Sequence, residues 1–217
     1  MPSSKVQAIR PQGGYLHPDA RILVFAKAPR AGTVKTRLIP ALGPEGAAAV
    51  HRLLTTHTVA TLSRSRLAPL TLCVTPDVDD DFLRALARRA GMALEAQEEG
   101  DLGWRMAAAL RRAQADGARV LLVGTDCPNL DEAYLDAALE ALESGADVVL
   151  GPAEDGGYVL VGLSRPVDER LFQHIDWGTD QVLEQTRARI QALGWSWREL
   201  PPRWDVDRPE DLARLWA

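Results

Sequence analysis

Cysteine is scarce in this sequence of 217 residues, and an excess of positive charge is missing, since 25 Lys and Arg stand against 30 Asp and Glu. The two cysteines, Cys73 and Cys127, lie far apart and form no C-x-x-C or Cys/His pattern, so neither a disulfide framework nor a zinc site is indicated. The net charge is −5 and the isoelectric point is near 5.4, which argues against nucleic acid or an anionic membrane surface as a partner. A charged ligand must therefore be met by a local cluster of side chains.

Long apolar runs are also missing. No stretch approaches the roughly 18 residues that span a bilayer, and the first twenty residues lack the apolar core of a signal peptide. We therefore expect a cytoplasmic protein without stable membrane insertion. Residues 1–20 are polar and broken by proline and glycine, which is typical of a flexible N-terminal extension. Residues 21–217 are expected to form one domain, because a chain that is 46% hydrophobic can bury one sizeable core.

Apolar runs of strand length alternate with helical patterns from one end of the chain to the other. This alternation predicts an α/β fold with a single domain, in which a mostly parallel, doubly wound sheet carries helices on both faces. Strands are expected over 21–26, 69–75, 93–96, 120–123 and 147–150 and again after Gly157; helices are expected over 44–63, 79–90, 102–115, 131–144 and 179–193, the last capped by Thr179 or Asp180.

The loop after the first expected strand concentrates positive charge in an otherwise acidic chain. It contains Lys27, Arg30, Lys35 and Arg37. Sheets that bind mononucleotides receive phosphate groups after their first strand, so we interpret the loop as a phosphate contact. The alternative is an ordinary solvated basic loop. The chain has neither a P-loop nor a G-x-G-x-x-G pattern.

Lone carboxylates stand at two other places. Asp126 follows the apolar run 120–123, at the strand end where open α/β sheets bind their ligands, although it could simply end the strand or cap the next helix. Asp205 and Asp207 alternate on an extended segment, so they are expected to point to opposite faces and one of them to share a site with Asp126. The alternative for Asp207 is the cap of the following helix. A divalent cation commonly takes one or two carboxylates plus phosphate oxygens.

Two further segments are candidates for ligand contacts. Residues 100–106 present backbone amides at a helix start, and Arg105 adds a planar charged donor, although Asp101 could serve only as the cap and Trp104 only as a core anchor. Residues 154–157 form an E-D-G-G turn between two apolar runs, which is equally typical of a simple hairpin.

Five motifs occur in a fixed order along the chain: A-K-A-P-x-x-G-x-V-K-T-R-L, G-D-L-G-x-R-M, G-T-D-C-P-x-L, G-P-A-E-D-G-G-Y and D-V-D-x-P-E-D-L. Together they resemble a bacterial family of GT-A-like transferases with the nucleotide-diphospho-sugar transferase fold, whose members are often designated arsenosugar biosynthesis glycosyltransferases. The resemblance covers roughly residues 21–216. It implies a fold shared with sugar-nucleotide glycosyltransferases and with nucleotidylyltransferases such as the molybdenum cofactor guanylyltransferase.

The resemblance also implies roles for residues at the matching positions. The loop after the first strand becomes the nucleotide and phosphate contact, the lone aspartates become ligands of Mg²⁺ or Mn²⁺, and the E-D-G-G turn lies over the substrate. Together with the candidates from the residues alone, the set is Lys27, Gly32, Lys35, Arg37 and Arg105 for nucleotide and phosphate; Asp126 and Asp207 for the metal ion; Gly156, Gly157, Asp176 and Trp177 for the substrate; and Asp126 and Asp155 for catalysis.

The leading hypothesis is a metal-dependent glycosyltransferase that uses a nucleotide-diphospho-sugar donor and a small-molecule acceptor. The cation and the basic loop would stabilise the diphosphate leaving group, and Asp155 would act as base, with Glu154 and Asp176 as substitutes. The alternative is a nucleotidylyltransferase that joins a nucleoside triphosphate to a phosphorylated substrate. It is kept open because this chain has a single carboxylate in T-D-C-P where many glycosyltransferases of the fold have D-x-D. A third hypothesis is a non-catalytic nucleotide-sugar-binding protein.

The remaining aromatic residues and histidines are assigned structural roles. We expect the tryptophans of the last third to pack in the core or to form a homodimer surface, with the wall of an acceptor pocket as the alternative. His51 and His57 are six residues apart on one helix, hence on different faces, and both are interpreted as non-catalytic. The tryptophans concerned are Trp177, Trp195, Trp197 and Trp204.

Overall fold

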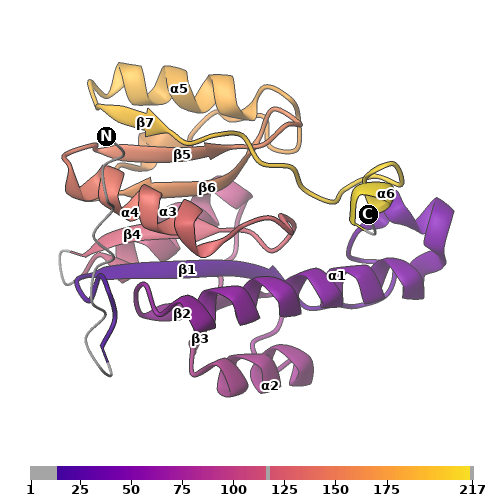
Figure 1. Ribbon diagram of the computed structural model, residues 1–217. Coiled ribbons are helices and arrows are strands. Elements are labelled where there is room, and N and C mark those ends of the chain that lie inside the picture. The colour runs from indigo at the N-terminus through magenta and orange to yellow at the C-terminus, as the bar shows by residue number, and fades with distance from the viewer. Residues whose placement is uncertain (1–13, 116–117, 216–217) are drawn as a thin grey trace, which may run out of the picture.

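The computed structural model describes residues 14–115 and 118–215, in which strands and helices alternate (Figure 1). In chain order the elements are β1 (Ala20–Lys27), the 3₁₀ helix η1 (Thr36–Leu38), α1 (Ile39–Ser65), β2 (Leu70–Thr75), α2 (Asp81–Ala90), β3 (Ala93–Ala96), α3 (Leu102–Ala113), β4 (Arg119–Val123), α4 (Glu132–Glu143), β5 (Val148–Pro152), β6 (Tyr158–Leu163), the 3₁₀ helix η2 (Glu169–Phe172), α5 (Val182–Ala192), β7 (Trp197–Glu199) and α6 (Asp211–Leu215).

The strands form one sheet of seven in the order β3-β2-β1-β4-β6-β5-β7. β1 pairs in parallel with both β2 and β4, and β5 pairs in parallel with β7. Of the strands in the described ranges, β6 alone is antiparallel to its neighbours, β4 and β5. The predicted α/β fold with a mostly parallel sheet is thus confirmed. The expected E-D-G-G hairpin is confirmed too, since residues 153–157 connect the antiparallel strands β5 and β6.

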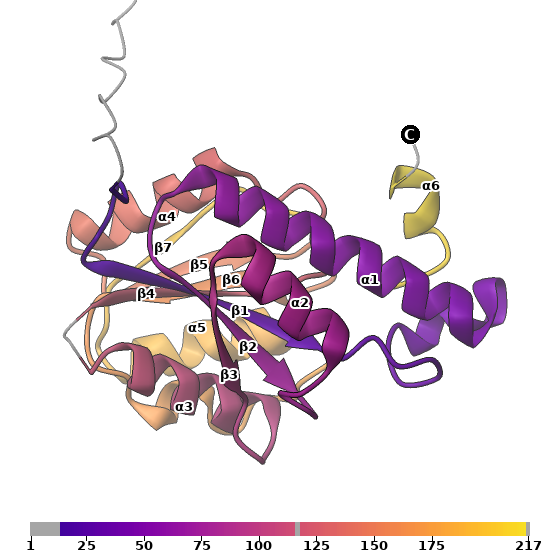
Figure 2. The same cartoon turned by 90° about the horizontal axis from the view of Figure 1, so that it is seen from below.

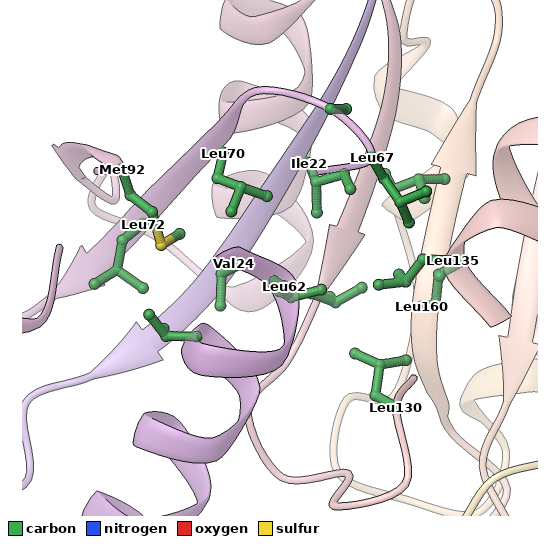
Figure 3. Packing of buried hydrophobic residues seen from close by; sticks show 14 of the residues in the cluster. Ile22, Val24, Leu62, Leu67, Leu70, Leu72, Met92, Leu130, Leu135 and Leu160 are labelled. Atoms are coloured by element: carbon green, nitrogen blue, oxygen red, sulfur yellow. The ribbon is translucent and has the colours of Figure 1, made fainter. Parts of the chain in front are cut away.

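Helices cover both faces of the sheet, as the alternation predicts (Figures 1 and 2). The first core cluster lies between the sheet and helices α1, α2 and α4, and Figure 3 shows Leu62 of α1 pointing toward Val24 of β1 and Leu160 of β6. The second cluster lies on the other face, under α3 and α5, and includes Leu110 and Ile190. None of the helices in the described ranges has both the length and the apolar character needed to cross a membrane.

Short sequence signals set most of the helix boundaries. Asp101 and Asp131 accept hydrogen bonds from backbone amides three residues later, so they cap α3 and α4. The boundaries of α1 and α5 differ from the prediction. Helix α1 begins at Ile39 and is kinked at Gly43, whose φ is +70°, a conformation that favours glycine. Helix α5 begins at Val182, and its N-cap is Gln181 without a side-chain bond, so the predicted cap by Thr179 or Asp180 is wrong.

A third, smaller cluster joins the two ends of the domain. It contains Leu38, Val50 and Leu54 from the start of the chain and Val206 from its end, and α6 lies beside the first half of α1 (Figures 1 and 2). This packing holds the C-terminal segment across the carboxyl ends of the central strands.

Most of the expected N-terminal extension, residues 1–13, lies outside the described residues. Residues 14–19 pack against the domain before β1 begins. The backbone amide of His17 donates to the carbonyl of Leu67, and its ring Nε2 lies 2.8 Å from Oδ1 of Asp136.

Candidate active site

A cleft of about 480 Å³ opens at the carboxyl ends of the central strands. Its floor is formed by the ends of β1, β2 and β4, and its walls by the β5–β6 turn and the C-terminal segment. This is the crevice in which open α/β sheets bind their ligands, because the strand order reverses here: the chain continues from β1 to β2 at one side and from β4 to β5 at the other. The charged side chains that line it are Lys27, Arg37, Arg105, Asp126, Asp155, Asp205 and Asp207.

Asp126 stands directly after the buried end of β4, where Gly124 and the buried Thr125 turn the chain. Its Oδ1 lies 2.8 Å from Nζ of Lys35 and 3.9 Å from Nδ1 of His51. Its backbone carbonyl accepts a hydrogen bond of 2.9 Å from the amide of Val206. Both the side chain and the main chain of Asp126 are therefore fixed by other elements.

Lys35 is more deeply placed than the sequence suggests. Its backbone is left-handed, with φ at +46°, and its side chain is only 3% exposed. The ammonium donates to the carbonyl of Val206 and pairs with Asp126. Lys35 thus lies under the floor of the cleft and is not one of its lining residues, so its predicted contact with phosphate remains a prediction that this geometry does not favour.

Arg37 and Asp207 form a second ion pair at the mouth of the cleft. Asp207 raises the pKa of Arg37 through this hydrogen bond and its charge. Asp207 does not cap the last helix, because the carboxylate of Asp211 accepts the backbone amides of residues 207 and 208.

Four carboxylates line the cleft: Asp126, Asp155, Asp205 and Asp207. Alternation along a strand predicts only one of Asp205 and Asp207 in the cleft, but both line it, so the expectation that these two side chains point to opposite faces is wrong. The reason is that the segment from 204 to 207 is irregular and has no pleat to enforce alternation. Burial raises the pKa of Asp205 to about 6, and the charges of Asp155 and Asp126 act in the same direction.

These carboxylates are suitable ligands for a hard divalent cation that takes its remaining oxygen ligands from a substrate. Within residues 14–115 and 118–215, no three His, Cys, Asp or Glu side chains are grouped closely enough to hold a metal ion by themselves. Oxygen donors from Asp126 and Asp207 are of the right chemical type, and Mg²⁺ is commonly bound by one or two carboxylates together with substrate phosphates. Asp126 pairs with Lys35, and Asp207 pairs with Arg37. A metal ion bound to either carboxylate would therefore share it with that cation.

Arg105 lines the other end of the cleft, near β2 and β3. Its Nη1 donates to Oε1 of Gln97 at 3.0 Å, and Nε2 of Gln97 donates to the carbonyl of Cys73 at 2.8 Å. Gln97 also lines the cleft and was missed in the sequence. The signal for it was its position: a polar amide at the carboxyl end of an expected strand, on the same sheet edge as Asp126.

His51, which the sequence led us to interpret as non-catalytic, lies at the cleft. Its Nε2 lies 2.9 Å from the carbonyl of Lys27, its Nδ1 faces Asp126, and its ring lines the cleft. Burial lowers the pKa of His51. His57 reaches a different loop, with Nε2 lying 2.9 Å from the carbonyl of Pro128. The two histidines do lie on different faces of α1, yet both support loops that surround the site.

The β5–β6 turn carries two consecutive carboxylates, Glu154 and Asp155, which have different partners. Oδ1 of Asp155 accepts the amide of Gly157 at 2.9 Å, and Asp155 lines the cleft. Among the residues that the structure describes, no cation pairs with Asp155. Glu154 instead pairs with Arg214, which lowers its pKa through the hydrogen bond between them. Gly156 has φ at +91°, and a Cβ there would lie 2.3 Å from the carbonyl of Asp180, so only glycine fits this turn.

Four predicted site residues do not line the cleft: Gly32, Lys35, Gly156 and Asp176. Asp176 is exposed, and its Oδ2 accepts a hydrogen bond of 2.7 Å from Gln185. Trp177 does line the cleft and meets Tyr158 edge to face, with ring centroids 6.4 Å apart. The other three tryptophans belong to or pack against the core clusters, as expected: Trp195, Trp197 and Trp204.

Comparisons with known proteins agree with this architecture. A sequence model of the family described as "Uncharacterized protein conserved in bacteria (DUF2064)" matches residues 58–179. The crystal structure of a candidate nucleotide-diphospho-sugar transferase from Desulfovibrio desulfuricans G20 has 33% sequence identity and a TM-score of 0.82, covering 92% of this chain and 87% of that one. No curated protein matches the sequence.

Two enzymes of low sequence identity share the fold. A cytidylyltransferase from Leptospira borgpetersenii serovar Hardjo-bovis is 15% identical with a TM-score of 0.61, over 92% of this chain and 85% of that one. A CMP:2-keto-3-deoxy-manno-octonic acid synthetase in complex with CTP is 10% identical with a TM-score of 0.57, over 90% of this chain and 96% of that one. At these identities the likeness concerns the fold alone.

Proposed function

This chain belongs to the bacterial DUF2064 family, and we propose that it acts in the cytoplasm as a metal-dependent glycosyltransferase with a nucleotide-diphospho-sugar donor. The observation that carries the proposal is the meeting of cations and carboxylates in one cleft at the carboxyl ends of β1 and β4. Its relative from Desulfovibrio desulfuricans, at 33% identity, supports a sugar nucleotide as the donor.

The diphosphate of the donor would be bound by the cations that line the cleft. Nζ of Lys27 donates only to the carbonyl of Thr33 among the residues described, and it is exposed. Arg37 is exposed beside Asp207, and Arg105 is aimed into the cleft by its bond to Gln97. Such fixed donors stabilise the charge that grows on the diphosphate as the glycosidic bond breaks.

Asp126 and Asp207 would hold Mg²⁺ or Mn²⁺. The ion would neutralise the diphosphate leaving group when bound. Lys35 then acts as a positioning residue, because its buried ammonium ties Asp126 to the carbonyl of Val206 and so fixes the first carboxylate relative to the segment that carries the second.

Asp155 is the best candidate for the base that takes the proton of an acceptor hydroxyl. It lines the cleft, is exposed, and keeps one oxygen free of the bond to Gly157. The two substitutes are less suitable, since Glu154 is paired with Arg214 and Asp176 is bonded to Gln185 outside the cleft. A general base must reach the proton that it removes.

Nucleotidyl transfer is the second candidate, and one observation favours it. Asp126 is the lone carboxylate of its loop, and its partner comes from residues 205–207 at the far end of the chain. In that reaction the phosphate of a substrate attacks the α-phosphorus of a nucleoside triphosphate, and pyrophosphate leaves. No general base is required, because the nucleophile is already an anion.

One assay separates the candidates. The protein is incubated with Mn²⁺ or Mg²⁺ and either nucleotide sugars or nucleoside triphosphates, together with acceptors. We expect release of a nucleoside diphosphate; release of pyrophosphate would identify the nucleotidylyltransferase, and ligand binding without turnover would identify a binding protein. Asp126→Asn should abolish most of the turnover, whereas Asp79→Asn, at an exposed carboxylate of the β2–α2 loop that does not line the cleft, should not change it. Full activity of Asp126→Asn would contradict the assignment of the metal site.

A further inference from the structure

A second cavity, of about 430 Å³, adjoins the cleft on the side of the C-terminal segment. The two share six lining residues, among them the carboxylates Asp155, Asp205 and Asp207. A molecule in the second cavity would therefore lie against the same carboxylates as the end of a donor in the first. The cleft that contains Lys27 and Arg105 is called the donor half below, and the second cavity is called the acceptor half.

The two halves differ in charge. The acceptor half is lined by six carboxylates and three arginines, which gives it three negative charges in excess. Two of its arginines are already paired inside it, Arg37 with Asp207 and Arg214 with Glu154. The remaining charged residues are one arginine and four carboxylates: Arg208, Asp155, Asp180, Asp205 and Asp211.

The acceptor half also has a rigid aromatic wall. The Trp204 ring packs against the cluster that contains Val206, and the guanidinium carbon of Arg214 lies 4.4 Å from its centroid. Arg214 is thus engaged by both an aromatic face and a carboxylate. The charge of Arg214 is offset by that of Glu154, so Arg214 does not reduce the excess of carboxylates in the acceptor half.

We propose that the acceptor half selects an uncharged or positively charged acceptor with a free hydroxyl, and that it disfavours a phosphorylated one. This inference rests on the proposed glycosyl transfer and names its substrate class. A phosphate brought among unpaired carboxylates is repelled, while an ammonium is attracted. In the reaction, the acceptor oxygen bonds to the anomeric carbon, the bond from that carbon to the diphosphate breaks, the nucleoside diphosphate leaves with the electron pair, and the acceptor proton passes to Asp155.

Three hexoses of the same shape test the proposal: glucose, glucosamine and glucose 6-phosphate. Their binding to the full chain is measured by saturation-transfer NMR at pH 7, which is above the pKa of Asp205, with and without nucleoside diphosphate and Mg²⁺. We expect glucosamine to bind most tightly and glucose 6-phosphate about tenfold more weakly than glucosamine or worse. Glucose 6-phosphate binding as tightly as glucosamine, or no detectable binding of any hexose, would overturn the proposal.

A charge reversal locates the effect. Asp180→Lys should reduce or invert the preference for glucosamine, because Asp180 lines the acceptor half. Glu184→Lys is the matched control, with the same change of charge four residues further on, at a position that lines neither cavity. Equal shifts in both variants would mean a general surface effect and would contradict the proposal. If Asp180→Lys fails to fold, Asp180→Asn should give a shift of the same sign and smaller size.

The proposed function can fail independently of this inference. Absence of nucleoside diphosphate binding, or of any effect of Asp126→Asn on turnover, would remove the glycosyltransferase assignment. The order of the hexoses measured without nucleotide, together with its change in Asp180→Lys, reports on the acceptor half, because Asp180 lines that cavity and not the donor half.

Discussion

The loop after β1 makes two contacts with carboxylates of the site, and they are built in opposite ways. Lys35 is 3% exposed and pairs with Asp126, which follows a core strand. Arg37, two residues later, is 54% exposed and pairs with Asp207 on an irregular segment. The first contact also includes the carbonyl of Val206, whereas the second consists of two side chains at the mouth of the cleft.

The difference separates a structural contact from an adjustable one. Asp126 is 46% exposed, but the Val206 carbonyl belongs to a buried residue, and leaving a buried acceptor without its donor costs about 1 to 3 kcal/mol, whereas an exposed ion pair is worth roughly 0 to 1 kcal/mol. Lys35 is therefore suited to fixing Asp126 and the C-terminal segment in place. Arg37 is suited to exchanging Asp207 for a substrate phosphate, because water and ligand can replace its partner at little cost. The following predictions test this contrast.

Lys35→Met should have the largest effect. It removes the ammonium and leaves the Val206 carbonyl without its donor, so we expect the free energy of unfolding to fall by about 2 kcal/mol and turnover to fall at least about a hundredfold through misplacement of Asp126. Chemical denaturation and product release measure the two quantities. Lys27→Met is the matched control, because the exposed ammonium of Lys27 lines the cleft; it should weaken donor binding and leave stability unchanged. Equal stability of the two variants would contradict the buried role of Lys35.

Val206→Ala should have the next largest effect, on stability alone. Val206 is fully buried in the cluster with Leu38 and Leu54, and truncation of a buried aliphatic side chain costs about 1 to 2 kcal/mol. The backbone bonds of Val206 to Asp126 and Lys35 are unaffected by the substitution, so turnover should fall much less than in Lys35→Met. Leu53→Ala, at a largely exposed position of α1, is the control and should change stability by less than about 0.5 kcal/mol. A large loss of turnover in Val206→Ala would contradict this prediction, because it would mean that the side chain of Val206 also positions the residues of the site.

Local signals explain why the fold could be predicted so fully. The strand at 93–96 and the caps Asp101 and Asp131 depend on residues within one or two turns of each other, and the strand has the bounds predicted for it. The errors occur where tertiary contacts override such signals. The kink at Gly43 lets α1 begin early, and the tight approach of Gly156 to the backbone of Asp180 precedes the start of α5.

The site was only partly predictable, because its geometry depends on distant packing. Asp126, Asp155 and Arg37 were identified from motifs, and the structure brings them to one cleft. The burial of Lys35 depends on Val206, 171 residues away in sequence, and no spacing rule connects the two. Gln97 was missed, and the place of His51 at the cleft was not foreseen, because each is held by a backbone carbonyl of a strand, and a carbonyl carries no sequence signal.

Arg37→Gln tests the adjustable contact. We expect less than about 0.5 kcal/mol of destabilisation, together with about a tenfold rise in KM for the donor and a smaller change in kcat, since the lost group binds phosphate. The effect should shrink as ionic strength rises, because salt screens exposed charges. Initial rates at several donor and salt concentrations measure it. A loss in kcat with unchanged KM would instead mean that Arg37 acts only in the transition state.

Glu154→Gln should have the smallest effect, and it extends the comparison to a third ion pair that is exposed on both sides. Glu154 and Arg214 are about half exposed, so neutralising Glu154 should leave the denaturation midpoint unchanged. The substitution frees Arg214 and makes the acceptor half less negative, so the preference for glucosamine over glucose 6-phosphate should fall by about twofold. The hexose titration measures this shift, with Glu184→Gln as the control outside both cavities. A preference that rises in Glu154→Gln would contradict the charge argument, because it would mean that the pair with Arg214, and not the excess of carboxylates, decides which acceptor is bound.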